Sequence, residues 1–168
     1  MAVNDLHALL KHELGDILYA EKTVLKGLKK MSKEVKDPEM NERLLRHYEE
    51  TEGQIENVER AFETIGEKAR AQKCPGILGL MEEHKEFSEE EEPTDEVQEA
   101  FDLGAGLRVE HYEIAAYNTA IALARTLGYT ECATLLDENL RQEMEMERFL
   151  RTNASKALRK LNAQMAEV

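Results

Sequence analysis

Four glutamates occupy positions at which an amphipathic helix normally carries an apolar side chain. At about 100° per residue, each lies near the centre of an apolar stripe on its own helix. The four residues are Glu21, Glu113, Glu143 and Glu147. Burying an ionised carboxylate without compensation costs several kcal/mol, so such acids need positive charge nearby. Because divalent metal ions supply that charge in the most compact form, the pattern predicts a metal centre with carboxylate ligands.

A further acid and an amide lie on the helix expected after residue 37, where the pattern is less regular. Gln54 lies about 60–80° and Glu50 about 120° from the centre of the apolar stripe. A helix between two neighbours buries more than one edge, so both side chains could still face the interior, although Gln54 could instead bond a neighbouring acid. His47 lies one turn before Glu50. We interpret it as a flank histidine, with metal ligand or hydrogen-bond donor as the alternatives.

The spacing of these residues repeats between the two halves of the chain. Glu21 and Glu50 are 29 residues apart, and Glu113 and Glu143 are 30 residues apart. One residue of helix is about 1.5 Å of rise, so the repeat brings the four side chains to a similar height. Gln54 then follows Glu50 at the same i+4 offset at which Glu147 follows Glu143. This regularity is what a two-metal site with pseudo-two-fold symmetry requires.

Proline, glycine and capping residues divide the chain into helices that would carry these side chains. We expect four long helices over about residues 4–34, 38–66, 95–128 and 130–161, and a short one that begins after Gly76 and runs into the acidic segment 89–92. Abundant Ala, Leu, Glu and Lys, with few β-branched residues, favour helix throughout, and no strand is expected.

The lengths of the connections predict how the helices pair. Only a few residues join the first two long helices, or the last two, so each pair forms an antiparallel hairpin. Nearly thirty residues lie between the hairpins, enough to cross the length of a bundle. The sequence therefore predicts an all-α, ferritin-like four-helix bundle, formed by residues 1–168 as one domain, in which the long crossover contains the short extra helix.

Composition excludes several other kinds of protein. The 168 residues include 22 Lys and Arg and 35 Asp and Glu, which gives a net charge of −13. That charge repels phosphates, so neither nucleic acid nor an anionic membrane is expected as a partner. No segment approaches the roughly 20 apolar residues of a membrane span, and we expect a cytoplasmic protein. Cys74 and Cys132 are 58 residues apart and are interpreted as isolated reduced thiols.

Four segments together resemble the YciE/YciF family of ferritin-like stress proteins. They are DILYAEK at residues 16–22, HYEETEGQI at 47–55, RVEHYEIA at 108–115 and LRQE at 140–143. The resemblance implies a ferritin-like bundle with a di-iron or related dimetal centre, in a family associated with stress responses. Carried over residue by residue, it implies a metal-ligand set of Glu21, Glu50, Gln54, Glu113, Glu143 and Glu147.

The sequence departs from the usual ferritin-like pattern at two positions. Glu-x-x-His is expected on two of the helices, but Gly53 follows Glu50 and Met146 follows Glu143 at the third position. The resulting oxygen-rich site suits two iron or manganese ions better than copper. Because these histidines are absent, the sequence does not decide whether the site has redox activity toward oxygen or peroxide. Glu110 could be a ligand, a neighbour of the ligands or part of a dimer face, and Tyr117 could donate to a ligand, act in redox chemistry or fill the core.

Two functions are consistent with these observations. The first is a metal-binding protein that handles iron or oxidative stress. The second is a non-enzymatic stress or interaction protein whose buried acids share protons or form ion pairs with Lys or Arg across the core. In either case the short helix after Gly76 predicts a contact between the two copies of a homodimer.

Overall fold

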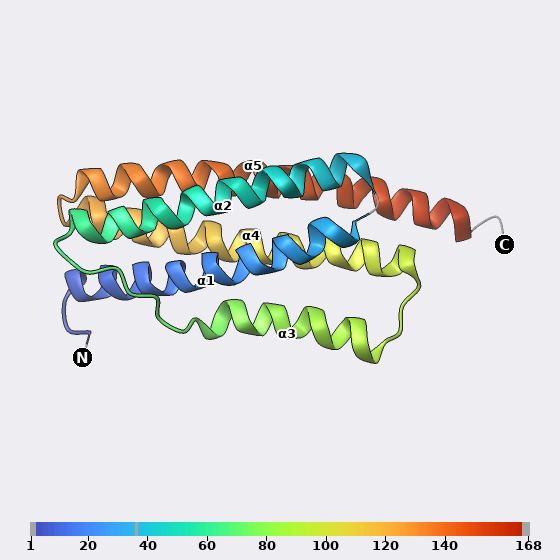
Figure 1. Cartoon of the computed structure of the whole chain (residues 1–168), viewed down its shortest axis with the longest axis horizontal. Coiled ribbons are helices and arrows are strands. Elements are labelled where there is room, and N and C mark those ends of the chain that lie inside the picture. Colours follow the sequence, from blue (N-terminus) through green and yellow to red (C-terminus); the bar gives the residue numbers. More distant parts are fainter. Residues whose placement is uncertain (1–2, 36, 166–168) are drawn as a thin grey trace. The chain divides into compact units, whose positions relative to one another are not determined.

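The computed structural model describes residues 3–35 and 37–165, and within these residues the chain forms helices and no strand (Figure 1). In chain order they are α1 (Leu6–Glu34), α2 (Pro38–Thr64), α3 (Pro75–Glu90), α4 (Asp95–Thr126) and α5 (Thr130–Met165). The all-helical prediction and the order of one short and four long helices are confirmed. α5 continues four residues beyond the predicted end near residue 161.

Local sequence explains where these helices begin and end. The Asp5 and Asp37 carboxylates accept hydrogen bonds from the first turns of α1 and α2, at 2.7 Å from Ala8 N and 2.8 Å from Met40 N. Pro38 then occupies the first turn of α2, where its missing N–H costs nothing. After α2 and α4 the chain reverses at Gly66 and Gly128, whose φ angles of 75° and 80° favour glycine.

The described residues divide into two compact units. Unit 1 contains the chain up to Cys74 together with Glu113–Gln142, and unit 2 contains Pro75–Tyr112 together with the chain from Glu143 onward. α1 and α2 lie wholly in unit 1 and α3 in unit 2, whereas α4 and α5 each contribute a segment to both. The expectation of a single domain over residues 1–168 stays a prediction.

One hydrophobic core in unit 1 is built by segments of four helices. Leu14 of α1, Phe62 of α2, Ile121 of α4 and Leu136 of α5 are among its buried members. Fully burying a side chain of this size is worth about 1.5–3 kcal/mol relative to leaving it exposed. α1 and α2 also pack directly on each other, as expected for helices that only three residues separate. The core thus holds in place the helical segments that carry most of the predicted site residues.

The connection that leaves α2 runs back along α1 within unit 1. Gln72 N donates to Gly15 O at 2.8 Å, and Lys11 Nζ lies 2.6 Å from Glu67 Oε2. A Cβ on residue 15 would lie 3.0 Å from the Arg70 carbonyl oxygen, so glycine permits this close approach. The first part of the predicted crossover therefore has a defined path.

Unit 2 is organised by contacts between α3 and the first half of α4. The rings of Phe87 and Phe101 stack with centroids 3.7 Å apart, and His84 Nε2 lies 2.8 Å from Asp102 Oδ1. At the start of α3, the ring of Tyr112 lies over Gly76, where a Cβ would come within 2.5 Å of it. Among the described residues, none of the helices has the length and apolar content that crossing a bilayer requires.

Candidate metal centre

Buried polar side chains among the described residues include most of those singled out in the sequence. None of these side chains is more than 3% exposed. They are Glu21, His47, Thr51, Gln54, Glu110, Glu113, Asn139 and Glu143. Four of the six predicted ligands are thus fully buried, whereas the side chains of Glu50 and Glu147 are 10% and 16% exposed.

Glu21 of α1 takes part in a hydrogen-bonded chain inside unit 1. The Tyr117 hydroxyl of α4 donates to Glu21 Oε1, and Asn139 Nδ2 of α5 donates to the Tyr117 oxygen at 3.0 Å. Asn139 Nδ2 also donates to the Gln54 backbone oxygen at 3.1 Å, and its Oδ1 accepts from Asn57 Nδ2 at 2.8 Å. This chain joins all four helical segments of the unit, and Glu113 is buried one turn before Tyr117 on α4.

Glu50 interacts with arginines of its own helix. Arg43 Nη1 donates to Glu50 Oε2 at 2.9 Å, and Arg46 Nε donates to Oε1 at 2.8 Å. Burial alone would raise the pKa of the Glu50 carboxyl, but the hydrogen bond with His47, the charge and hydrogen bond of Arg43 and the hydrogen bond of Arg46 together outweigh it and lower the pKa to about 2. Glu50 is therefore ionised at neutral pH, with both oxygens engaged by cations.

His47 is buried and oriented by that same carboxylate. Its Nδ1 lies 3.4 Å from Glu50 Oε2, and Thr51 Oγ1 donates to its backbone oxygen at 2.9 Å. Because an ionised carboxylate only accepts, this contact is a hydrogen bond when Nδ1 carries the ring proton. In the neutral imidazole the lone pair is then on Nε2, which is also buried. A carboxylate that orients a histidine in this way is typical of metal sites.

Two buried carboxylates of unit 2 come from α4 and α5. Glu110 is 3% exposed and Glu143 is 1% exposed. One turn after Glu143, Glu147 Oε1 accepts from Arg151 Nε at 3.0 Å and lies 3.9 Å from His111 Nε2. Glu147 is therefore partly exposed and has a cationic neighbour in Arg151, as Glu50 has in Arg43 and Arg46 on α2.

Three of the buried residues have side chains of the kinds that bind metal ions. His47 lies in unit 1, whereas Glu110 and Glu143 lie in unit 2, and each offers one possible ligand atom for a metal ion. An imidazole nitrogen with carboxylate oxygens is a donor set that iron, manganese and zinc all accept. The residues present therefore fit a first-row metal ion by their chemistry.

The sequence pattern did not single out two of these buried residues, His47 and Glu110, as expected metal ligands. It favoured a flank position for His47, yet the structure buries this residue, and it gave Glu110 no preferred role. The one available indication was the position of His47 one turn before an acid on the same helix. Asn139 was missed entirely, although it lies one turn before Glu143 on α5 and is fully buried.

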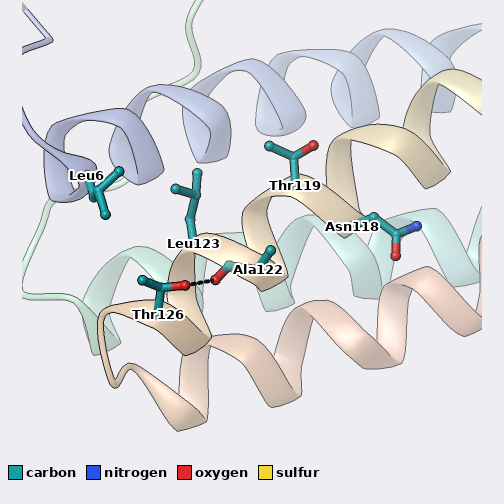
Figure 2. Close-up of a pocket in the computed structure, with 6 residues that line it drawn as sticks. All are labelled: Leu6, Asn118, Thr119, Ala122, Leu123 and Thr126. Carbon is teal, nitrogen blue, oxygen red and sulfur yellow. Dashed lines mark hydrogen bonds between the residues drawn. The ribbon is translucent and has the colours of Figure 1, made fainter.

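A surface pocket in unit 1 is lined by apolar and uncharged polar side chains, unlike the buried acids described above. Figure 2 shows its lining residues, Leu6, Asn118, Thr119, Ala122, Leu123 and Thr126. Thr126 Oγ1 is occupied by a hydrogen bond to the Ala122 carbonyl at 2.8 Å. Because the lining holds no acid, histidine or cysteine, the buried polar residues and not this pocket carry the candidate chemistry.

Solved structures define the class of protein to which this fold belongs. The crystal structure of the Escherichia coli stress protein YciF matches with a TM-score of 0.85 and 34% identity, over 94% of this chain and 99% of that one. YcfI from Rhodopseudomonas palustris matches with a TM-score of 0.84 and 36% identity, over 89% of this chain and 95% of that one. The chain is thus an all-helical protein with the YciF fold.

The sequence comparisons agree with the structural ones. Residues 5–163 match DUF892, described as a domain of unknown function. Protein YciF of Escherichia coli K12 is 36% identical over 144 residues, which is 85% of this chain and 86% of that protein. The chain belongs to the DUF892 family, and its resemblance to the YciF stress proteins is confirmed.

Proposed function

We propose that this protein is a ferritin-like member of its family whose helices form a bundle around a carboxylate-rich metal centre. The observation that carries the proposal is the near-complete burial of Glu21, Glu110, Glu113 and Glu143. Burying four carboxylates of one chain is unfavourable unless cations compensate them. In the proposed bundle, α1 with α2 and α4 with α5 are the two hairpins, and residues 65–94 are the crossover.

The proposed centre holds two ions of iron or manganese, with ligands drawn from both halves of the chain. His47, Glu110 and Glu143 would hold one ion, and Glu21 and Glu113 would hold the other. Gln54, Glu50 and Glu147 complete the set predicted from the sequence. The contacts of Glu50 with His47 and of Glu147 with Arg151 favour orienting roles for these two acids.

Bound iron or manganese would supply redox chemistry toward oxygen or peroxide, which suits a role in iron or oxidative-stress handling. The residues of this chain contribute binding and orientation. Glu50 would orient the ring of His47 and favour the tautomer whose Nε2 lone pair can bind the metal, while burial keeps the carboxylates away from water.

Metal analysis of the purified protein tests the proposal directly. Elemental analysis after incubation with Mn²⁺ or Fe²⁺ and removal of excess metal should give close to two ions per chain. Glu143→Gln combined with Glu21→Gln should abolish binding. The matched control is Glu145→Gln, an exposed acid two residues from Glu143 that should bind as the wild type does. Wild-type protein that stays metal-free, and whose melting temperature EDTA does not change, would overturn the proposal.

A second candidate function is favoured by the ion pairs of Glu50. Because Arg43 and Arg46 already neutralise this acid, part of the polar interior is compensated without metal. A non-enzymatic stress or interaction protein, whose remaining acids share protons or pair, is consistent with that pattern. It predicts a melting temperature that is the same with EDTA and with added Mn²⁺, whereas the metal centre predicts a higher one with Mn²⁺.

Assembly and compartment complete the proposal. We propose a homodimer that forms through the α3 region and functions in the cytoplasm, without nucleic acid or membrane as a partner. The net charge of −13 supports the exclusion of polyanionic partners. Sedimentation equilibrium would test the dimer, since a monomer mass over the accessible concentration range contradicts it, and cell fractionation would test the compartment.

A further inference from the structure

The hydroxyl of Tyr117 lies between the buried carboxylate of Glu21 and the buried amide of Asn139, and the chemistry of these partners fixes the direction of both hydrogen bonds. Asn139 has one terminal atom 3.1 Å from the Gln54 backbone oxygen. A backbone carbonyl only accepts, so that atom must be the amide nitrogen. The orientation of the Asn139 side chain is therefore set by chemistry, and its Oδ1 faces Asn57 Nδ2 at 2.8 Å.

The same amide nitrogen fixes the hydroxyl of Tyr117. Asn139 Nδ2 lies 3.0 Å from the Tyr117 oxygen and has a second proton to donate to it. The Tyr117 oxygen thus accepts from Asn139, and its own proton is directed to Glu21 Oε1. All three side chains are buried, so water does not compete for these bonds.

We propose that Tyr117 is a positioning residue, which holds the Glu21 carboxylate in the orientation in which it binds metal; this inference rests on the proposed metal centre. A glutamate side chain has several rotatable bonds, and a ligand that is already oriented loses less freedom when the metal binds. Asn139 acts one step further away, because it sets the direction in which the Tyr117 hydroxyl donates.

A double-mutant cycle on metal affinity tests the inference. The Kd for Mn²⁺ is measured by isothermal titration calorimetry for the wild type, Tyr117→Phe, Glu21→Gln and the double variant. Tyr117→Phe removes only the hydroxyl and should raise Kd about tenfold, as is typical for the partners of metal ligands. In the Glu21→Gln background the same change should alter Kd less than about twofold, because the interaction that it removes is already absent.

Tyr129→Phe is the matched control, since Tyr129 is also a hydrogen-bonded tyrosine of unit 1 but its hydroxyl contacts His7 Nδ1 at 3.0 Å. It should leave Kd unchanged in both backgrounds. An unchanged Kd in Tyr117→Phe, or an equal loss with and without Glu21→Gln, overturns the positioning role and leaves the metal centre standing. Wild-type protein that binds no Mn²⁺ overturns both, so the two failures are distinguishable.

Discussion

Arg43 Nη1 donates to Glu50 Oε2 at 2.9 Å, and both side chains are only about one tenth exposed. Replacing the acid would leave the guanidinium of Arg43 without its anionic partner in a largely buried position. Glu50→Gln should therefore lower the free energy of unfolding at pH 7 by about 1–3 kcal/mol. Urea denaturation in EDTA measures this, with Glu49→Gln, an exposed neighbour on α2, as the control that should change little.

The lowered pKa of Glu50 also predicts how the difference in free energy of unfolding between the wild type and Glu50→Gln depends on pH. In the folded protein the pKa is about 2, below its ordinary value of 4.5. A group of this kind stabilises the fold fully above its unfolded pKa and loses the effect as pH falls toward its folded pKa. The wild type should therefore exceed Glu50→Gln in stability by a constant amount between pH 7 and about 5.5, and the gap should narrow below pH 4.5. Urea titrations at several pH values test this, and a gap that widens in acid contradicts it.

Replacing Gly15 or Gly27 of α1 by alanine should change the stability of the protein in opposite directions. A Cβ at residue 15 would lie 3.0 Å from Arg70 O and 3.2 Å from Gln72 Cβ, whereas nothing lies within 4 Å at residue 27. Gly15→Ala should therefore destabilise the protein by about 1–3 kcal/mol, because the connection after α2 must shift. Gly27→Ala should stabilise it by about 0.5–1 kcal/mol through helix propensity. Thermal melts followed by circular dichroism compare the two, and equal effects would contradict the packing of this connection on α1.

Gly76 and Gly79 of α3 allow the same comparison of a crowded with an open glycine position. The ring of Tyr112 lies within 2.5 Å of the position that a Cβ on Gly76 would take, but Gly79 has open space. We expect Gly76→Ala to displace the ring and lower the melting temperature by several degrees, and Gly79→Ala to leave it equal or higher. If Gly76→Ala melts like the wild type, then the start of α3 does not pack under Tyr112 as described.

The two thiols should be unreactive in the native protein. Cys74 and Cys132 are fully buried, and burial raises the pKa of the Cys132 thiol to about 11, although a hydrogen bond with Thr64 partly opposes this. Because the thiolate is the reactive form, labelling by Ellman's reagent at pH 8 should be slow for both thiols and rapid in urea. Fast labelling of Cys132→Ser or Cys74→Ser protein without denaturant would show that the remaining thiol is accessible.

Helix boundaries and inward-facing acids were predictable because they depend on local rules. The capping aspartate before Pro38 placed the start of α2, and the apolar stripes identified Glu21, Glu113 and Glu143 as buried. Periodicity describes one stripe, however, and a helix with several neighbours buries more than a stripe. This is why His47, 60–80° from the centre of its stripe by the roughly 100° step of a helix, is nevertheless buried.

The partners of these side chains were beyond the reach of the sequence. Asn139 donates to the backbone of Gln54, 85 positions away along the chain, and no local pattern relates the two. Glu147 lies in an apolar stripe yet is partly exposed beside Arg151, since an arginine one turn later can draw an acid toward the surface. Whether a carboxylate meets a cation, a hydroxyl or a metal depends on such tertiary contacts.

α4 and α5 each contribute residues to both compact units, so neither unit is formed by one contiguous segment of the sequence. Ending the coding sequence after residue 112 would remove nearly half of α4 and all of α5, which deletes part of each unit at once. Conventional truncation therefore cannot isolate either one. An engineer who wants unit 1 alone must join Cys74 to Glu113 with a new linker and stop at Gln142.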